Sequence, residues 1–153
     1  MNSGAPAKPL IDGEWLLLLR STLAHGEHFR WPLQGTSMRP TLPPGCLIEI
    51  APLPNLPRLG DIVVFFAGGA LVAHRLVQRH GDTWITQGDG RPGADRPQAA
   101  TLALGVVIGA FRTDGRRFWP GRFSHAQAGW WIARYHLLKN LRRIRNLLKE
   151  KLL

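Results

Sequence analysis

A continuous apolar run between two glycine turns constrains the fold of this chain more than any other stretch. The run is Ile62-Val63-Val64-Phe65-Phe66, with Gly60-Asp61 before it and Gly68-Gly69 after it. An uninterrupted apolar run of this kind suits a buried strand. The glycine pair is a hairpin signal, so Leu71–Gln78 is expected to return as the partner strand. The middle of the chain is therefore expected to be a β-sheet.

Glycine and proline residues also separate the expected strands on both sides of this hairpin. Twelve Pro and seventeen Gly in 153 residues favour strands and turns over a helical bundle. The expected strands are Phe29–Leu33, Cys46–Ala51, Ile62–Phe66, Leu71–Gln78, Thr83–Gln87 and Leu102–Arg112. The proline-rich connector Pro52–Leu59 and the polar loop Gly88–Gln98 are expected to be irregular. The length suits one domain with its own core.

Helical patterns lie at the two ends of the chain. From Asp12 to His25 the apolar residues fit a short helix, with Asp12 as the N-cap and Gly26 as the stop. After a basic linker at 113–124, apolar residues recur at helical spacing from about Ala126 onward. The expected fold class is mainly β, with a short helix in residues 1–28, a β domain in 29–112, and a linker with a long basic amphipathic helix in 113–153.

The positive charge belongs almost wholly to the C-terminal segment. Residues 1–110 hold 9 Lys/Arg and 8 Asp/Glu, which gives +1, whereas residues 111–153 hold 11 and 2, which gives +9. Such a segment needs an anionic partner or an exposed surface. The first interpretation of residues 126–153 is that the leucine face packs on the β domain or a protein partner while the basic face is solvated. An anionic membrane surface comes second and nucleic acid last.

Several classes of protein are excluded by the composition. The longest apolar run in the N-terminal helix, Trp15–Leu19, is closed by Arg20, against the roughly 20 residues that a bilayer requires. Without such a span or a signal peptide, a cytoplasmic protein is expected, with peripheral membrane association left open. The single cysteine, Cys46, excludes an internal disulfide and a cysteine zinc site, and is expected to pack in the core. The histidines outside the central strands show no metal-ligand spacing, so no metal or cofactor is expected.

A serine, a histidine and two aspartates are the candidates for chemistry. Ser37 lies in a small-residue turn, and its hydroxyl is a poor nucleophile unless a base accepts its proton. His74 is a polar residue in an otherwise apolar strand and is the candidate base. Asp89 and Asp95, in the loop Gly88–Gln98, are candidates for orienting it. Taken singly, each has a structural alternative: Ser37 as a cap, His74 as a satisfied histidine, and the aspartates as turn residues.

Four ordered blocks together resemble the motif set of type I signal peptidases. They are Gly35-x-Ser37-Met38-x-Pro40-Thr41, Gly60-Asp61-Ile62-Val63-Val64-Phe65, His74-Arg75, and Gly88-Asp89 followed by Asp95-Arg96. The resemblance covers residues 33 to about 112 and implies a signal-peptidase-like β-fold. Bacterial signal peptidases and the related self-cleaving repressors carry a lysine base, whereas the endoplasmic-reticulum and archaeal type carries a histidine. The chain has no lysine between residues 9 and 138, which favours the Ser–His type.

The resemblance implies roles for individual residues. Ser37 would be the nucleophile, His74 the general base, and Asp95 or Asp89 the group that orients His74. The backbone N–H of Ser37 is an expected oxyanion donor. Some relatives supply a hydroxyl where this chain has Gly35, so that donor is absent, and Thr36 is a candidate to help. The family's Ser-Met pair makes Met38 either a neighbour of the substrate cleft or a core residue.

The implied activity is that of a serine endopeptidase that cleaves a polypeptide precursor after a small residue. Typical signal peptidases have a transmembrane anchor, which is not evident here. The resemblance therefore implies either a soluble relative that trims a specific precursor, or one anchored by its C-terminal helix. The alternatives from other classes are a catalytically inactive peptide-binding relative and a membrane- or nucleic-acid-associated module that uses residues 126–153. The complete Ser/His/Asp set favours the enzyme.

Overall fold

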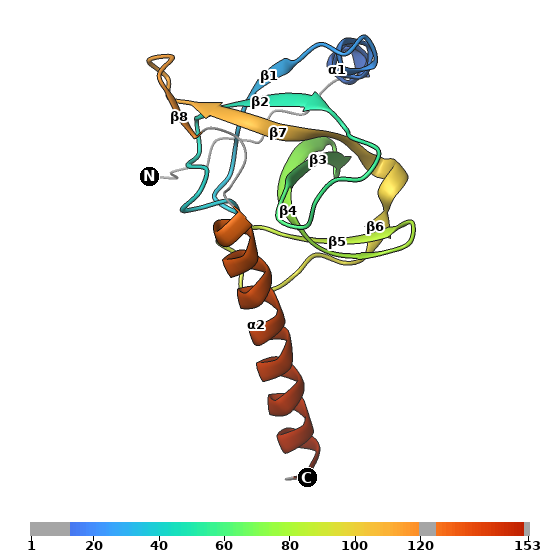
Figure 1. Cartoon of the computed structure of the whole chain (residues 1–153), viewed down its shortest axis with the longest axis vertical. Helices are drawn as coiled ribbons and strands as arrows, with labels where there is room; N and C mark the ends of the chain where they lie inside the picture. The colour runs from blue at the N-terminus through green and yellow to red at the C-terminus, as the bar shows by residue number, and fades with distance from the viewer. Residues whose placement is uncertain (1–12, 120–124, 152–153) are drawn as a thin grey trace, which may run out of the picture.

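The computed structural model describes residues 13–119 and 125–151. Within these residues an eight-stranded antiparallel sheet follows a short helix, and a long helix ends the chain (Figure 1). The elements are α1 (Gly13–Ala24), β1 (Phe29–Pro32), β2 (Leu47–Pro52), β3 (Ile62–Ala67), β4 (Ala70–His80), β5 (Thr83–Gln87), β6 (Gln98–Ala99), a 3-10 turn (Ala100–Leu102), β7 (Ala103–Phe111), β8 (Arg117–Trp119) and α2 (His125–Lys151). The prediction of a mainly β chain with a helix near each end is confirmed.

The strand order places β7 between the two halves of the sheet. The order is β1-β2-β7-β3-β4-β5-β6, and β8 pairs with the C-terminal end of β7, at Ala110 and Phe111. The apolar run of the sequence is β3, and its Ile62, Val63 and Val64 are each no more than 1% exposed. It pairs with β7 on one side and forms the predicted hairpin with β4 on the other. The prediction of a buried central strand is confirmed.

The hydrophobic core extends beneath the turn that carries Ser37. Its larger cluster combines Leu19 and Leu23 of α1 with residues of β2, β3 and β7. Met38 and Leu42, on either side of the turn's Pro40, belong to the same cluster. Because a well-packed side chain has little freedom, these two residues fix the turn against the sheet. Cys46 is buried in this cluster, as predicted.

The end of α1 follows its predicted glycine signal. Gly26 comes two residues after the helix, with φ +79°, and its N–H donates to the carbonyl of Leu23. A left-handed residue after the last turn is the usual helix stop, and glycine adopts it without a steric cost. Asp12, the predicted N-cap, lies outside the described residues.

Helix α2 packs on the sheet through the face that carries Tyr135 and Lys139. Tyr135 is buried, its hydroxyl donates to Gln78 Oε1 on β4, and Lys139 Nζ contacts the same oxygen. The large apolar residues on the other side of the helix are between 53% and 59% exposed; they are Trp130, Leu137, Leu141, Ile144 and Leu148, called the outer stripe below. The outer stripe therefore does not pack on the β domain, which corrects that part of the first interpretation; its alternative, a protein partner, stays a prediction. Figure 1 shows the C-terminal part of α2 projecting away from the sheet.

Three short segments differ from their predicted structure. Residues 113–119 turn at Gly115 and return as the edge strand β8, in a segment expected to be a linker; residues 120–124 lie outside the described residues. Pro52, expected in the connector, closes β2 opposite Gly105, because the last residue of a strand can lack a donor. The polar loop ends in the two-residue strand β6. None of the helices in the described residues is long and apolar enough to cross a membrane.

Candidate active site

Three of the four predicted polar residues meet in one hydrogen-bonded chain. Nε2 of His74 lies 3.0 Å from Oγ of Ser37, and Nδ1 of His74 lies 2.6 Å from Oδ2 of Asp95. Ser37 comes from the turn after β1, His74 from the middle of β4, and Asp95 from the loop after β5. The fold thus brings together segments that are 37 and 21 residues apart.

The protonation of Asp95 determines how His74 is oriented. Burial raises the pKa of the Asp95 carboxyl, but hydrogen bonds from His74 and Thr86 and favourable electrostatic interactions with His74 and Arg91 outweigh it, so the pKa lies below its ordinary value. An ionised carboxylate only accepts, so Nδ1 of His74 carries the hydrogen that it donates to Asp95. In the neutral ring Nε2 is then the acceptor for the hydroxyl of Ser37. This is the proton arrangement of a nucleophile, a base and an orienting acid.

Asp95 is held in turn by Thr86 of β5. The Thr86 hydroxyl donates to Asp95 Oδ2 at 2.6 Å, and the Asp95 N–H donates to the Thr86 carbonyl at 2.8 Å. Gln98 of β6 donates to the same hydroxyl at 3.2 Å. Neither Thr86 nor Gln98 was identified from the sequence. The only sequence signal for Thr86 is that it is a polar residue inside a strand, and such residues rarely have a functional cause.

Asp89 does not contact His74, which corrects its place among the predicted catalytic residues. Its carboxylate accepts two hydrogen bonds from Arg75, from Nε at 2.8 Å and from Nη2 at 2.5 Å. The side chains of this pair are each 1% exposed. Thr41 Oγ1 also donates to Asp89 Oδ2, at 2.5 Å, and Arg75 Nη1 donates to the Gly60 carbonyl. Asp89 is therefore the centre of a buried network behind the site.

The alternation of strand β4 explains how one dipeptide serves both networks. Successive side chains of a strand point to opposite faces, so His74 and Arg75 project in opposite directions. His74 is directed to Ser37 and Asp95, whereas Arg75 reaches Asp89. The two ends of the loop 89–95 are thus each fixed to β4. The Asp89 end is further joined to the serine turn through Thr41.

The serine turn and the aspartate loop approach each other so closely that the loop needs glycine. The N–H of Gly90 donates to the Ser37 carbonyl at 2.8 Å. A Cβ added at Gly88 would lie 2.6 Å from the Ser37 carbonyl oxygen and 3.1 Å from the Ser37 Cβ. A Cβ at Gly90 would lie 2.9 Å from the Arg39 carbonyl oxygen. Since these obstacles are mostly backbone, they cannot move aside, and a side chain at Gly88 would displace Ser37.

The residues predicted to bind the oxyanion or the substrate fall in different environments. Within the described part of the chain, the Ser37 N–H has no hydrogen-bond partner and is free to act as a donor. Gly35 is exposed and has φ +81°, a conformation that favours glycine, and Thr36 is also exposed. Met38 is only 1% exposed and lies in the core. Of the two roles predicted for Met38, the core role is therefore the one observed, and the contact with substrate is corrected; Met38 anchors the turn.

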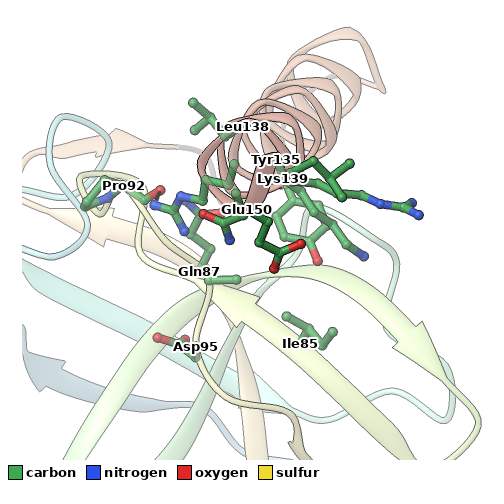
Figure 2. A pocket seen from close by; sticks show the side chains of 13 residues that line it. Ile85, Gln87, Pro92, Asp95, Tyr135, Leu138, Lys139 and Glu150 are labelled. Atoms are coloured by element: carbon green, nitrogen blue, oxygen red, sulfur yellow. Dashed lines mark hydrogen bonds between the residues drawn. The ribbon is translucent and has the colours of Figure 1, made fainter. Parts of the chain in front are cut away.

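A groove of about 590 Å³ lies on the α2 side of the aspartate loop. Figure 2 shows Tyr135, Leu138, Lys139 and Glu150 of α2 above it, with Ile85, Gln87 and Asp95 of the sheet and loop below. Ser37 and His74 do not line this groove. Because it lies beside Asp95 and away from the serine hydroxyl, we do not assign the scissile bond to it.

Helix α2 holds the aspartate loop from outside the sheet. Nη1 of Arg134 donates to the Asp89 carbonyl at 3.2 Å, and Nη2 of Arg142 donates to the Pro92 carbonyl. The Arg142 guanidinium occupies the space where a Cβ of Gly93 would point. The guanidinium carbons of Arg75 and Arg134 lie 5.1 Å and 5.2 Å from the centre of the Trp131 ring, within the range of a cation–π interaction. The side of α2 that carries Trp131, Arg134, Tyr135 and Arg142, called its inner face below, thus supports the loop that carries Asp95.

Among the described residues, no three His, Cys, Asp or Glu side chains gather closely enough to hold a metal ion. No protein-family model matches the chain, and no curated protein is similar enough to count as a relative. The geometry of the site and the four motif blocks are therefore the observations that bear on its chemistry.

Proposed function

We propose that the protein is a serine endopeptidase of signal-peptidase type, with Ser37 as nucleophile, His74 as general base and Asp95 as the orienting acid. The observation that carries the proposal is the hydrogen-bonded chain from Ser37 Oγ through the His74 ring to Asp95, with distances of 3.0 and 2.6 Å. A histidine within hydrogen-bond reach of a serine, and itself fixed by a carboxylate, is what an activated serine requires.

The proposed reaction is acyl transfer. Ser37 Oγ attacks the carbonyl carbon of a peptide bond while His74 Nε2 takes the hydroxyl proton. The negative oxygen of the tetrahedral intermediate is stabilised by the Ser37 N–H, which has no other partner in the described residues. His74 then returns the proton to the leaving amine, and water, activated by the same histidine, releases the acyl group. Asp95 stabilises the imidazolium that forms in each half of the reaction.

The assignment to the signal-peptidase type rests on the ordered motif blocks, to which the geometry adds support. The Ser-Met-x-Pro-Thr block has a physical use at each end: Met38 and Thr41 fix the serine turn to the core and to Asp89. The Gly-Asp block allows the close approach of Gly88 to Ser37. A polypeptide substrate cleaved after a small residue is the specificity that the resemblance implies.

The test uses a probe that does not depend on knowing the substrate. A fluorophosphonate, which reacts with activated serines, is expected to label the wild-type chain once, and peptide mapping should locate the label at Ser37. Ser37→Ala and His74→Ala are expected to reduce labelling, and cleavage of candidate precursor peptides, by at least about 10³-fold. Ser21→Ala, at an exposed serine of α1, is the matched control and should label like the wild type.

Two results would contradict the proposal. One is labelling or cleavage that persists in both Ser37→Ala and His74→Ala at the wild-type rate. The other is a folded wild-type chain that neither reacts with the probe nor cleaves any peptide of a library with small residues at the scissile position. In that case the site around Ser37 would belong to a peptide-binding protein that does not catalyse a reaction.

A further inference from the structure

The outer stripe of α2 is a continuous apolar surface. Its members, Trp130, Leu137, Leu141, Ile144 and Leu148, follow one another at steps of seven, four, three and four residues. Such steps return to the same side of a helix, so the five side chains form one line along it. All five are more than half exposed. A line of this length is far more than the scattered apolar residues that a protein surface normally carries.

The β domain cannot cover this line, because it already contacts the other side of the helix. Among the described residues, the side chains of α2 that contact the sheet or its loops include Trp131, Arg134, Tyr135, Lys139 and Arg142. All residues from Leu141 to Glu150 are exposed, so the distal half of α2 extends past the sheet. Within residues 13–119 and 125–151 no other segment covers the stripe, so we look for its covering surface outside them.

The charge of α2 determines which covering surface fits. Residues 129–150 hold six Lys or Arg and a single acidic residue, Glu150. A second copy packed stripe to stripe would bring two such cationic helices together, and like charges at that distance repel. The best match is a surface that offers apolar and anionic groups side by side. The interface of an anionic bilayer does so, with acyl chains beneath phosphate groups.

We propose that α2 binds the surface of an anionic membrane, lying in its plane with the outer stripe directed to the acyl chains. Arg145 and Lys149, which lie beside the stripe in the exposed half of the helix, contact the lipid phosphates. Trp130 lies at the end of the stripe nearest the sheet, and its amphipathic ring suits the headgroup level. The inner face of α2 holds the aspartate loop, so the site is held about one helix diameter, roughly 10 Å, above the membrane.

This inference does not depend on the proposed catalysis, and its test uses the full chain without substrate. Wild-type protein is sedimented with vesicles of mixed phosphatidylcholine and phosphatidylglycerol and, separately, of phosphatidylcholine alone. We expect strong binding to the anionic vesicles that falls with added salt, and at least about tenfold weaker binding to the neutral ones. Ser37→Ala should bind the vesicles like the wild type, so a failure of the catalytic proposal leaves this result unaffected.

Single substitutions identify the side of the helix that binds. Ile144→Gln and Leu141→Gln remove members of the outer stripe, and each is expected to weaken binding about tenfold. Leu147→Gln is the matched control: Leu147 is 51% exposed in the same turn of the helix but lines the groove on the other side. Its binding should stay within about twofold of the wild type. Because all three positions are exposed, circular dichroism should show unchanged helix content.

Three outcomes would overturn the proposal. The first is a wild-type chain that stays in the supernatant with anionic vesicles at low salt. The second is an equal loss in the stripe variants and in Leu147→Gln, which would mean that no particular side of α2 binds. The third is a wild-type dimer in sedimentation equilibrium that Ile144→Gln converts to a monomer, or a stripe-dependent complex with an acidic peptide in place of vesicle binding, since either would assign the stripe to a protein.

Discussion

Asp95 and Asp89 lie six residues apart in one loop, yet their carboxylates do different work. Asp95 accepts from His74 and Thr86, and these hydrogen bonds keep its pKa low. Asp89 accepts from Arg75 and Thr41 and neutralises a buried guanidinium. The first is placed to orient the His74 ring, and the second to hold the loop.

Substituting each aspartate by asparagine should separate these effects. Asp95→Asn should lower the rate of fluorophosphonate labelling by about 10³- to 10⁴-fold, because an amide can favour the wrong tautomer of His74, and should cost less stability than Asp89→Asn. Asp89→Asn leaves the Arg75 charge buried without its partner and should cost about 3–5 kcal/mol of unfolding free energy. Labelling rates and urea unfolding of both variants measure the two effects. Equal losses of stability in the two variants would contradict this division.

The lowered pKa of Asp95 also predicts how stability changes with pH. The carboxyl binds its proton more weakly in the folded chain than in the unfolded chain, so ionised Asp95 stabilises the fold. This contribution is complete above the ordinary carboxyl pKa of about 4 and is lost as pH falls through the lower folded value. The difference in unfolding free energy between wild type and Asp95→Asn should therefore be constant near neutral pH and shrink below about pH 4. Urea unfolding across this range is the measurement, and a difference that grows with acid would contradict it.

At the scale of elements, the contact between the serine turn and the aspartate loop is limited by backbone atoms. Gly88→Ala should push Ser37 away from His74 and lower labelling at least about tenfold, because a 1 Å displacement at a reacting centre can cost about 10²-fold. Gly129→Ala is the control, since its Cβ would meet nothing within 4 Å in helix α2. It should leave labelling unchanged and stabilise the chain by up to about 1 kcal/mol. Similar labelling by the two variants would show that the close approach is not needed.

The inner face of α2 should affect the site through the loop it holds. Arg142→Ala removes the hydrogen bond to the Pro92 carbonyl. It should reduce the labelling rate by up to about tenfold, because the segment that carries Asp95 becomes looser. Arg142→Lys, which keeps a donor, should recover part of the rate. Arg143→Ala removes a neighbouring cation that also lines the groove and is the control. If Arg143→Ala lowered labelling as much as Arg142→Ala, a general effect of charge would replace the positioning role.

Local patterns predicted the elements of this fold better than the contacts between them. The run Ile62–Phe66 was recognisable as a buried strand because burial on both faces leaves no polar position. The amphipathic pattern of α2 defined two faces of the helix, but which face meets the sheet depends on Gln78 and Pro92, far away in the chain. Strand β8 was missed because its pairing with β7 comes from a return turn at Gly115 in a basic segment.

The candidate site shows the same difference between what local patterns predict and what depends on contacts between distant segments. The motif blocks selected Ser37 and His74 as candidates, because few residue types can act as nucleophile or base, and the fold places the two side chains within 3.0 Å of each other. They left Asp89 and Asp95 equivalent, since both follow glycine-rich turns and only the fold shows which one reaches the imidazole. Thr86 had no signal of its own, because its importance lies entirely in what it touches.

At the scale of the whole molecule, the position of β7 has a consequence for how the protein is made. The β1–β2 pair beside the serine turn and the β3–β6 unit that carries His74 join only through β7 within the described sheet. Ribosomes synthesise Ser37, His74 and Asp95 before they reach Ala103, where β7 begins. A growing chain thus contains the three residues before it contains the strand that unites their two halves. We therefore expect the two halves of the candidate site to come together only after β7 has been synthesised.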